Sequence, residues 1–128
     1  MNLLIVALDP AIPADVPDAN VLVVAPAVNS WLRHWLSDDA AARRQAEERV
    51  AAYVDGLERS GVHAEGRVGD ADPLQAIADT LPTFSADEIL IAAGSELAAR
   101  AANGLVTRAR LRFSVPVSRA EESLPMAA

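Results

Sequence analysis

The 128-residue sequence contains no cysteine, and all eleven of its basic residues are arginine, so lysine is missing as well. Without cysteine the chain has no disulfide framework, no thiol nucleophile and no cysteine-ligated zinc site. Without lysine it has no Schiff-base chemistry and no Walker-type lysine on a phosphate. These absences remove several large classes of enzyme and of nucleotide-binding loop.

Positive charge and long apolar runs are also scarce. The formal net charge is −7 and the isoelectric point is about 4.7, which disfavours binding to nucleic acid or to anionic membranes through a general basic field. The first residues, MNLLIVAL, carry no basic region, and their apolar run is too short for a signal peptide or a membrane span. We therefore expect a cytoplasmic protein with no nucleic-acid and no membrane partner.

Apolar residues make up 52% of the chain, enough for the core of one domain. Continuous apolar runs at 3–8, 21–25 and 89–93 are typical of strands buried on both faces of a parallel sheet. Residues 62–68 alternate apolar and polar, which predicts an edge strand with one wetter face. Residues 114–118 are a short fifth candidate.

Helix signals separate these strands. Residues 38–60 carry an apolar stripe, and Gly61 is placed to end that helix. Residues 72–81 form a second helix, with Asp72 as N-cap and Gln75 at the third position of an Asp-type capping box.

A third helix, or a broken pair, covers residues 97–112, and Gly104 is its weak point. The alternation of strands and helices predicts an α/β fold with an open, mostly parallel sheet and right-handed crossovers. Pro10, Pro13 and Pro17 forbid a long regular helix between the first two strands, so the first crossover helix is expected to be missing or shortened.

The segment PAVNSWLRHWLS follows the second strand and carries bulky apolar residues four positions apart. It either packs over sheet surface left bare by the missing helix or forms a patch for a partner. Because an under-covered sheet face usually marks an interface, we expect a homodimer with this segment at or near the contact. The candidate interface residues are Trp31, Leu32, Trp35 and Leu36.

The segments LLIVALD, VLVVAPAV, VGDADPLQAI, DEILIAAGSE and GLVTRARLRFSVPV together resemble the universal stress protein superfamily, and more closely an uncharacterised actinobacterial branch of it. The resemblance covers most of residues 2–118. It implies a three-layer sandwich with five strands in the order 3-2-1-4-5, a single domain over 1–118, and a tail over 119–128. In the family, an Asp after the first strand contacts the adenine end of ATP, and Asp9 matches it.

The chain departs from the glycine motif G-x2-G-x9-G-[ST] that wraps the phosphates in this family. Three positions after Gly94 stands Leu97, and the residue after Gly104 is Leu105 instead of serine or threonine. The spacing from Gly94 to Gly104 fits the second half of the motif, but the first glycine would then be Ile91. The family's last strand often pairs with itself across a dimer, and here charged residues after Ser118 discourage that mode.

The strand order that the resemblance implies also gives a location for a ligand. In an open α/β sheet, ligands bind beyond the carboxyl ends of the strands where the strand order reverses, here between strands one and four. The candidate nucleotide-contacting residues are Asp9, Val24, Asp70, Gly94, Ser95 and Gly104. For Gly94 and Ser95 a plain strand-to-helix turn is the alternative, and for Asp70 a turn residue is the alternative to a ribose ligand.

The remaining polar residues predict no active site. His34 and His63 are far apart in the sequence and make no recognisable metal site. The basic stretch from Arg100 to Arg112 is either a solvated helix face or a site for an anionic ligand or partner.

We find no catalytic constellation and expect no enzyme and no obligatory cofactor. Our first hypothesis is a non-enzymatic stress-associated or regulatory protein that acts through protein contacts. The second is a protein that binds an adenine nucleotide, ATP or AMP, through a rearranged phosphate loop. A small hydrolase is the third hypothesis, although it lacks a visible nucleophile or base.

Overall fold

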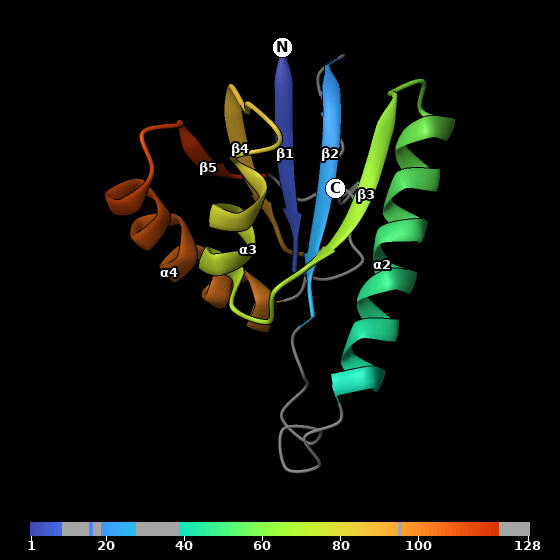
Figure 1. Ribbon diagram of the computed structural model, residues 1–128, viewed down its shortest axis with the longest axis horizontal. Helices are drawn as coiled ribbons and strands as arrows, with labels where there is room; N and C mark the ends of the chain where they lie inside the picture. The colour runs from blue at the N-terminus through green and yellow to red at the C-terminus, as the bar shows by residue number, and fades with distance from the viewer. Residues whose placement is uncertain (9–15, 17–18, 28–38, 95, 121–128) are drawn as a thin grey trace.

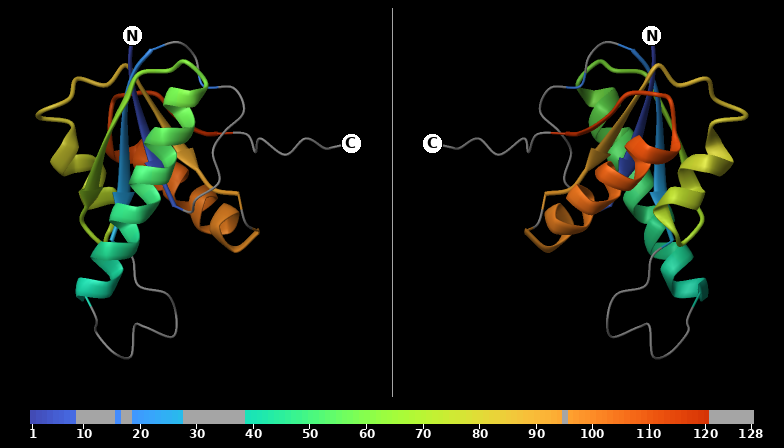
Figure 2. Two further views of the ribbon diagram at one scale, coloured as in Figure 1. Left: turned by 90° about the vertical axis from the view of Figure 1, so that its right-hand side faces the viewer. Right: turned by 90° about the vertical axis from the view of Figure 1, so that its left-hand side faces the viewer.

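The computed structural model describes residues 1–8, 16, 19–27, 39–94 and 96–120, and these form a five-stranded parallel sheet with helices on both faces (Figures 1 and 2). The strand order is β3-β2-β1-β4-β5, and all four pairings are parallel. The predicted α/β sandwich and strand order are therefore confirmed. The elements are β1 (Asn2–Ala7), β2 (Asn20–Pro26), α2 (Asp39–Arg59), β3 (Ala64–Gly69), α3 (Pro73–Thr80), β4 (Glu88–Ala92), α4 (Glu96–Arg112) and β5 (Val117–Arg119).

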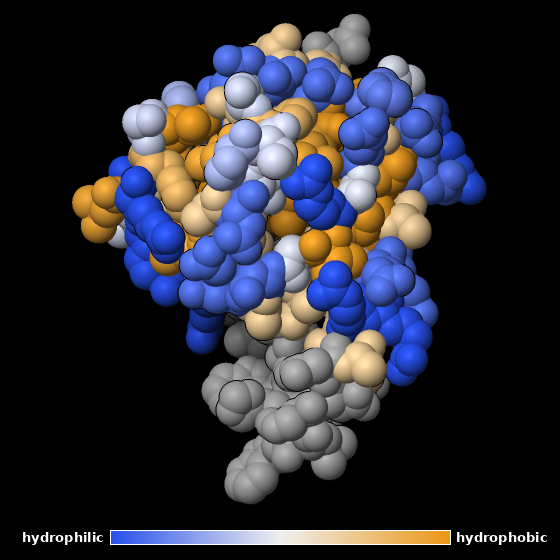
Figure 3. Space-filling model, viewed as in Figure 1, coloured by the Kyte–Doolittle hydropathy of each residue, from blue (hydrophilic) through white to orange (hydrophobic). Residues whose placement is uncertain are grey.

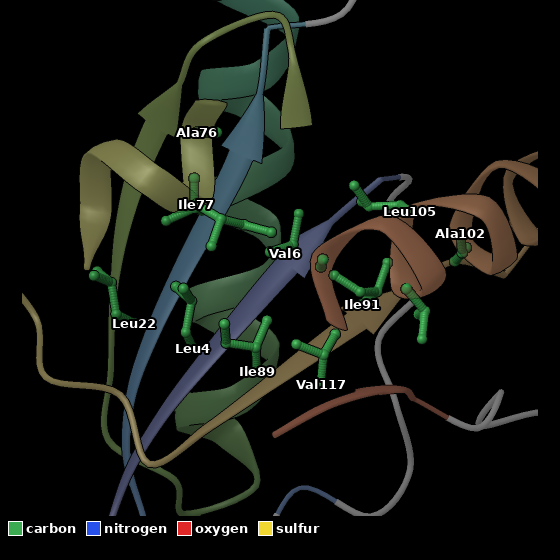
Figure 4. Close-up of a cluster of buried hydrophobic side chains, with 14 residues drawn as sticks. Leu4, Val6, Leu22, Ala76, Ile77, Ile89, Ile91, Ala102, Leu105 and Val117 are labelled. Atoms are coloured by element: carbon green, nitrogen blue, oxygen red, sulfur yellow. The ribbon is translucent and has the colours of Figure 1, made fainter. Parts of the chain in front are cut away.

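Two apolar clusters fill the space on either side of the sheet. One joins alternate residues of the strands to α3 and α4, with Ile77 and Leu105 among its fully buried members (Figure 4). The other joins the opposite set of strand residues to α2, where Tyr53 and Leu57 are buried. Strand β1 contributes to both clusters because its successive side chains point to opposite faces. Leu3 to Ala7 have no exposed surface, as a doubly covered strand requires.

The connection from β1 to β2 carries the proline-rich segment. Its described residues Val16 and Ala19 pack against the cluster on the α2 face. The prediction of a missing or shortened crossover helix concerns residues 9–18, most of which lie outside the described residues.

Helix α2 ends where the sequence predicted. Gly61 has φ of 87°, its N–H donates to the Glu58 carbonyl at 3.0 Å, and the Val62 N–H donates to the Leu57 carbonyl at 3.0 Å. This pair of bonds is the Schellman motif, with glycine in the left-handed position. Val62 and Leu57 also share the apolar cluster, so the chain leaves α2 already directed into β3.

Helix α2 approaches β3 so closely that only glycine fits at the contact. A Cβ atom added to Gly66 would overlap Val50 Cγ1 and lie 3.0 Å from Val54 Cγ2. The valines of α2 therefore rest on bare backbone, and the helix sits lower on the sheet than a side chain at position 66 would allow.

Helix α3 begins with the predicted cap but without the full capping box. Asp72 Oδ1 accepts the Leu74 N–H at 3.0 Å, and Pro73 occupies the first turn. The box is not formed, because the Asp72 N–H that Gln75 would have to accept is donated to Asp70 Oδ1 at 2.9 Å. This expectation is corrected: Gln75 Nε2 donates to its i,i+4 partner Asp79 Oδ1 at 2.7 Å.

Near the C-terminal side, α4 follows the first of two predicted alternatives, a single helix, and β5 differs from its predicted bounds. Helix α4 runs without a break from Glu96 to Arg112, through Gly104. Strand β5 covers 117–119 instead of 114–118, since Pro116 has no N–H to donate and Ile89 N–H bonds to its carbonyl at 2.9 Å. None of the described helices is both long and apolar enough to cross a bilayer.

Candidate functional site

The sheet reverses its strand order between β1 and β4, and this is where the fold can hold a ligand. Ala7 pairs with Ala92, and the Leu8 N–H donates to the Ala92 carbonyl at 3.0 Å, so the two strands end together. After β4 the chain passes Gly94 and turns into α4 at Glu96. The N-terminus of a helix carries a partial positive charge, which attracts anions.

Gly94 is the candidate residue that the structure places at this reversal, where it is half-buried. Asp9 and Ser95 flank the same reversal in the sequence, but both lie outside the described residues. The meeting of Asp9 with the Gly94 turn therefore remains a prediction from the strand order.

Val24 lies inside β2 and belongs to the core. Its side chain is fully buried on the α3 face, and its backbone is in register with Val6 on one side and Arg67 on the other. Its Cγ1 atom lies 2.9 Å from the point where a Cβ on Gly69 would stand. The Val24 side chain therefore packs in the core between β2, β3 and α3.

Asp70 and Asp72 are both used by the turn that starts α3. Asp70 Oδ1 accepts the Asp72 N–H at 2.9 Å, and Asp72 in turn caps the helix. They follow β3, which is three strand spacings from β4, or about 14 Å across the sheet. The structure thus places Asp70 away from Gly94. The hydrogen bond that Asp70 accepts from Asp72 supports the alternative to ribose binding, a turn residue.

Gly104 lies in the interior of α4, eight residues after Glu96, which is about 12 Å along a helix axis. It is exposed, and an added Cβ would meet nothing within 4 Å. Gly104 is thus at a distance from the turn at Gly94, and no close approach requires a glycine there.

A matched pair of glycine substitutions tests these two assignments. Gly104→Ala is expected to raise the free energy of unfolding by up to about 1 kcal/mol, because alanine is the better residue in an open helix position. Gly61→Ala is expected to lower it by about 1–2 kcal/mol, since its φ of 87° strains any L side chain. Urea unfolding at one protein concentration measures both. A destabilising Gly104→Ala would mean that position 104 is constrained by something outside the described residues.

The other candidate polar residues have structural roles or are solvent-exposed. His63 is exposed, and its Nδ1 lies 4.0 Å from Glu58 Oε2. In the described part of the chain, no three His, Cys, Asp or Glu side chains come together as a possible metal site. Arg110 Nε donates to the Val117 carbonyl at 2.8 Å and so ties α4 to β5. Arg112 lies over the ring of its neighbour Phe113, 5.4 Å from the centroid.

Sequence reasoning did not single out Arg49. Its Nη1 donates to the Pro26 carbonyl at 3.2 Å and brings a guanidinium to the carboxyl end of β2. In the sequence, Arg49 is one of many charged residues of α2, and nothing there predicts this contact. It becomes visible only from the packing of α2 over β2. The candidate interface residues Trp31, Leu32, Trp35 and Leu36, with His34, lie outside the described residues.

Comparison with known proteins identifies the fold. Neither a protein-family model nor a curated protein sequence matches the chain. The structure is similar to that of a universal stress protein family protein from Arabidopsis thaliana, solved with AMP bound. The TM-score is 0.61, the match covers 96% of this chain and 93% of that chain, and the sequence identity is 14%. The chain therefore has a universal-stress-protein-like fold, as its sequence segments predicted.

Proposed function

We propose that this protein, which has a universal-stress-protein-like fold, is a cytoplasmic regulatory or stress-associated protein without enzymatic activity. It acts through contacts with other proteins. The observation that supports it best is the position of Gly104, in the interior of α4 and about 12 Å from the helix start. A loop that wraps phosphates needs backbone N–H groups converging on one point, and a helix interior has none to offer.

The composition supports the hypothesis that the protein is not an enzyme. The chain has no cysteine or lysine nucleophile and only two histidines. One of these, His63, is exposed beside Glu58 at the start of β3, at the opposite end of the sheet from the reversal. General acid–base catalysis needs such a group within hydrogen-bond reach of the reacting atoms.

Binding of an adenine nucleotide is the second candidate function. The similar Arabidopsis thaliana structure was solved with AMP bound, and the match extends over 96% of this chain. The turn at Gly94 and the N-terminus of α4 lie at the carboxyl end of β4, where topology locates a ligand. A monophosphate needs fewer N–H donors than a triphosphate, so this arrangement suits AMP better than ATP.

Isothermal titration calorimetry with Mg-ATP and with AMP separates the two functions. We expect Mg-ATP to bind with Kd weaker than about 1 mM, a binding free energy of less than about 4 kcal/mol. Gly104→Ala serves as a folded control whose substitution lies away from the sheet reversal. A micromolar Kd for Mg-ATP that is lost in Asp9→Ala would overturn the proposed function in favour of nucleotide binding. Mass spectrometry of small molecules released from the purified protein would reveal a ligand of another class.

A further inference from the structure

Strand β3 leaves one edge of the sheet unpaired within the described part of the chain. It is the outermost strand, it is six residues long, and its middle residues Glu65, Gly66 and Arg67 are exposed. Figure 2 (left) views the molecule from this side and shows β3 running between α2 and α3. Such an edge is a template for another strand, and the side chains on it decide which strand can pair.

The hydrogen bonds to β2 show which residues of β3 face outward. The carbonyls of His63 and Gly69 accept the N–H groups of Val21 and Ala27, on the β2 side. Because the peptide groups of a strand alternate in direction, the odd-numbered residues of β3 turn their N–H and C=O toward β2. The even-numbered residues Ala64, Gly66 and Val68 turn theirs toward the open edge.

The charges on β3 are complementary to those of a second, antiparallel copy of the same strand. Glu65 and Arg67 are two positions apart, so they lie on the same face of the sheet with Gly66 between them. Arg67 is held along this face by a 3.1 Å hydrogen bond from its Nη1 to Thr83 Oγ1. An antiparallel copy of β3 centred on Gly66 would set Glu65 opposite Arg67 of the second copy, and Arg67 opposite Glu65.

We propose that two copies of this chain pair antiparallel through β3, with the two-fold axis at Gly66, to form a continuous ten-stranded sheet. In this register Gly66 exchanges both backbone hydrogen bonds with Gly66 of the second copy, and Ala64 does so with Val68. Registers centred one residue away set two Glu65 side chains, or two Arg67 side chains, directly opposite each other, which is unfavourable. The charges therefore select one register and one partner.

The position of α2 is compatible with this contact. Arg49 ties one flank of α2 to the end of β2, the strand on the inner side of β3. Val50 and Val54 are half-buried on its other flank, beside Gly66, and apolar surface lies between β3 and α2 in Figure 3. A second copy brings the same flank alongside and covers these valines. The other sheet edge, β5, is only three residues long and offers far less backbone.

Charge reversal tests the register directly. In Glu65→Arg the chain presents two arginines along the edge, and in Arg67→Glu it presents two glutamates. Each variant alone is expected to weaken homodimerisation at least about tenfold, because both cross-strand pairs become repulsive. An equimolar mixture of the two variants is expected to form a heterodimer, and the double variant Glu65→Arg/Arg67→Glu is expected to regain the homodimer. Arg108→Glu, at an exposed position on α4, is the matched control and should leave the dimer unchanged.

Sedimentation velocity gives the oligomeric state, and circular dichroism confirms that each variant is folded. A monomeric wild-type protein would overturn the proposal. It would equally be overturned if the dimer dissociation constants of the single variants equalled the wild-type value, or if their mixture failed to associate. The variant Trp31→Glu/Trp35→Glu tests the competing hypothesis that the tryptophan segment forms the contact. If this variant alone is monomeric and the β3 variants remain as dimeric as the wild type, the contact lies in the tryptophan segment.

Discussion

Leu105→Ala is expected to lower the free energy of unfolding by about 2–5 kcal/mol. Leu105 is 1% exposed, and it belongs to the cluster that seals α4 against the sheet (Figure 4). Removing three side-chain carbons loses their transfer free energy and leaves a cavity that the flanking residues Ala102 and Ala109 are too small to fill. Urea or thermal unfolding measures the loss.

The same helix supplies the control. Leu111 is 86% exposed, so Leu111→Ala makes the same chemical change where no core is disturbed. Its effect is expected to stay within about 0.5 kcal/mol. Equal losses for the two variants would contradict the core position of Leu105, because alanine is the better helix former and a loss cannot come from helix propensity.

Gly66→Ala is expected to destabilise the protein by about 1–3 kcal/mol, the usual cost of overpacking. The added methyl group would overlap Val50 Cγ1 and press on Val54 Cγ2, and both valines sit on a helix, where their side chains have one favoured rotamer. Helix α2 must therefore rise from β3 or the valines must take a poorer rotamer. The unfolding experiment is run at one protein concentration, because association also contributes to apparent stability.

Val50→Ala should partly rescue Gly66→Ala, because it removes the atom in the closest contact. The double variant is then expected to be more stable than the sum of the two single changes predicts, by about 0.5–3 kcal/mol of coupling. Additive losses would contradict the close packing of α2 on bare backbone. Gly61→Ala, whose strain involves no neighbour within 4 Å, should show no such coupling to Val50→Ala.

The strands and helices were predictable where a local pattern carries them. The buried runs of β1, β2 and β4 could be found because a strand covered on both faces must be apolar throughout. The end of α2 at Gly61 and the start of α3 at Asp72 follow from residue types that these positions demand. The shift of β5 past Pro116 shows the limit, since an apolar stretch does not reveal where ladder hydrogen bonds begin.

Contacts between distant segments were not predictable from the sequence. The sequence places Gly66 in a strand and Gly104 in a helix, but it does not reveal that α2 packs on Gly66 while an added Cβ at Gly104 would meet nothing within 4 Å. Gln75 fitted a capping box, but the Asp72 N–H that it would accept is donated to Asp70 Oδ1, and Gln75 bonds to Asp79 instead. The candidate site depends on the ends of β1 and β4 lying side by side, and spacing along the chain cannot fix that contact.

The central position of β1 also fixes when the protein can fold during its synthesis. β1 is made first, but only β2 follows it closely; β4, its second neighbour, begins at Glu88. On its β4 side, the amino end of β1 is closed by the residue before that late partner: the Asn2 N–H donates to Asp87 Oδ2 at 2.8 Å, and the Asp87 N–H donates to the Asn2 carbonyl at 2.7 Å. Until β4 leaves the ribosome, a nascent chain presents the most apolar strand of the protein as an open edge, the feature that promotes aggregation.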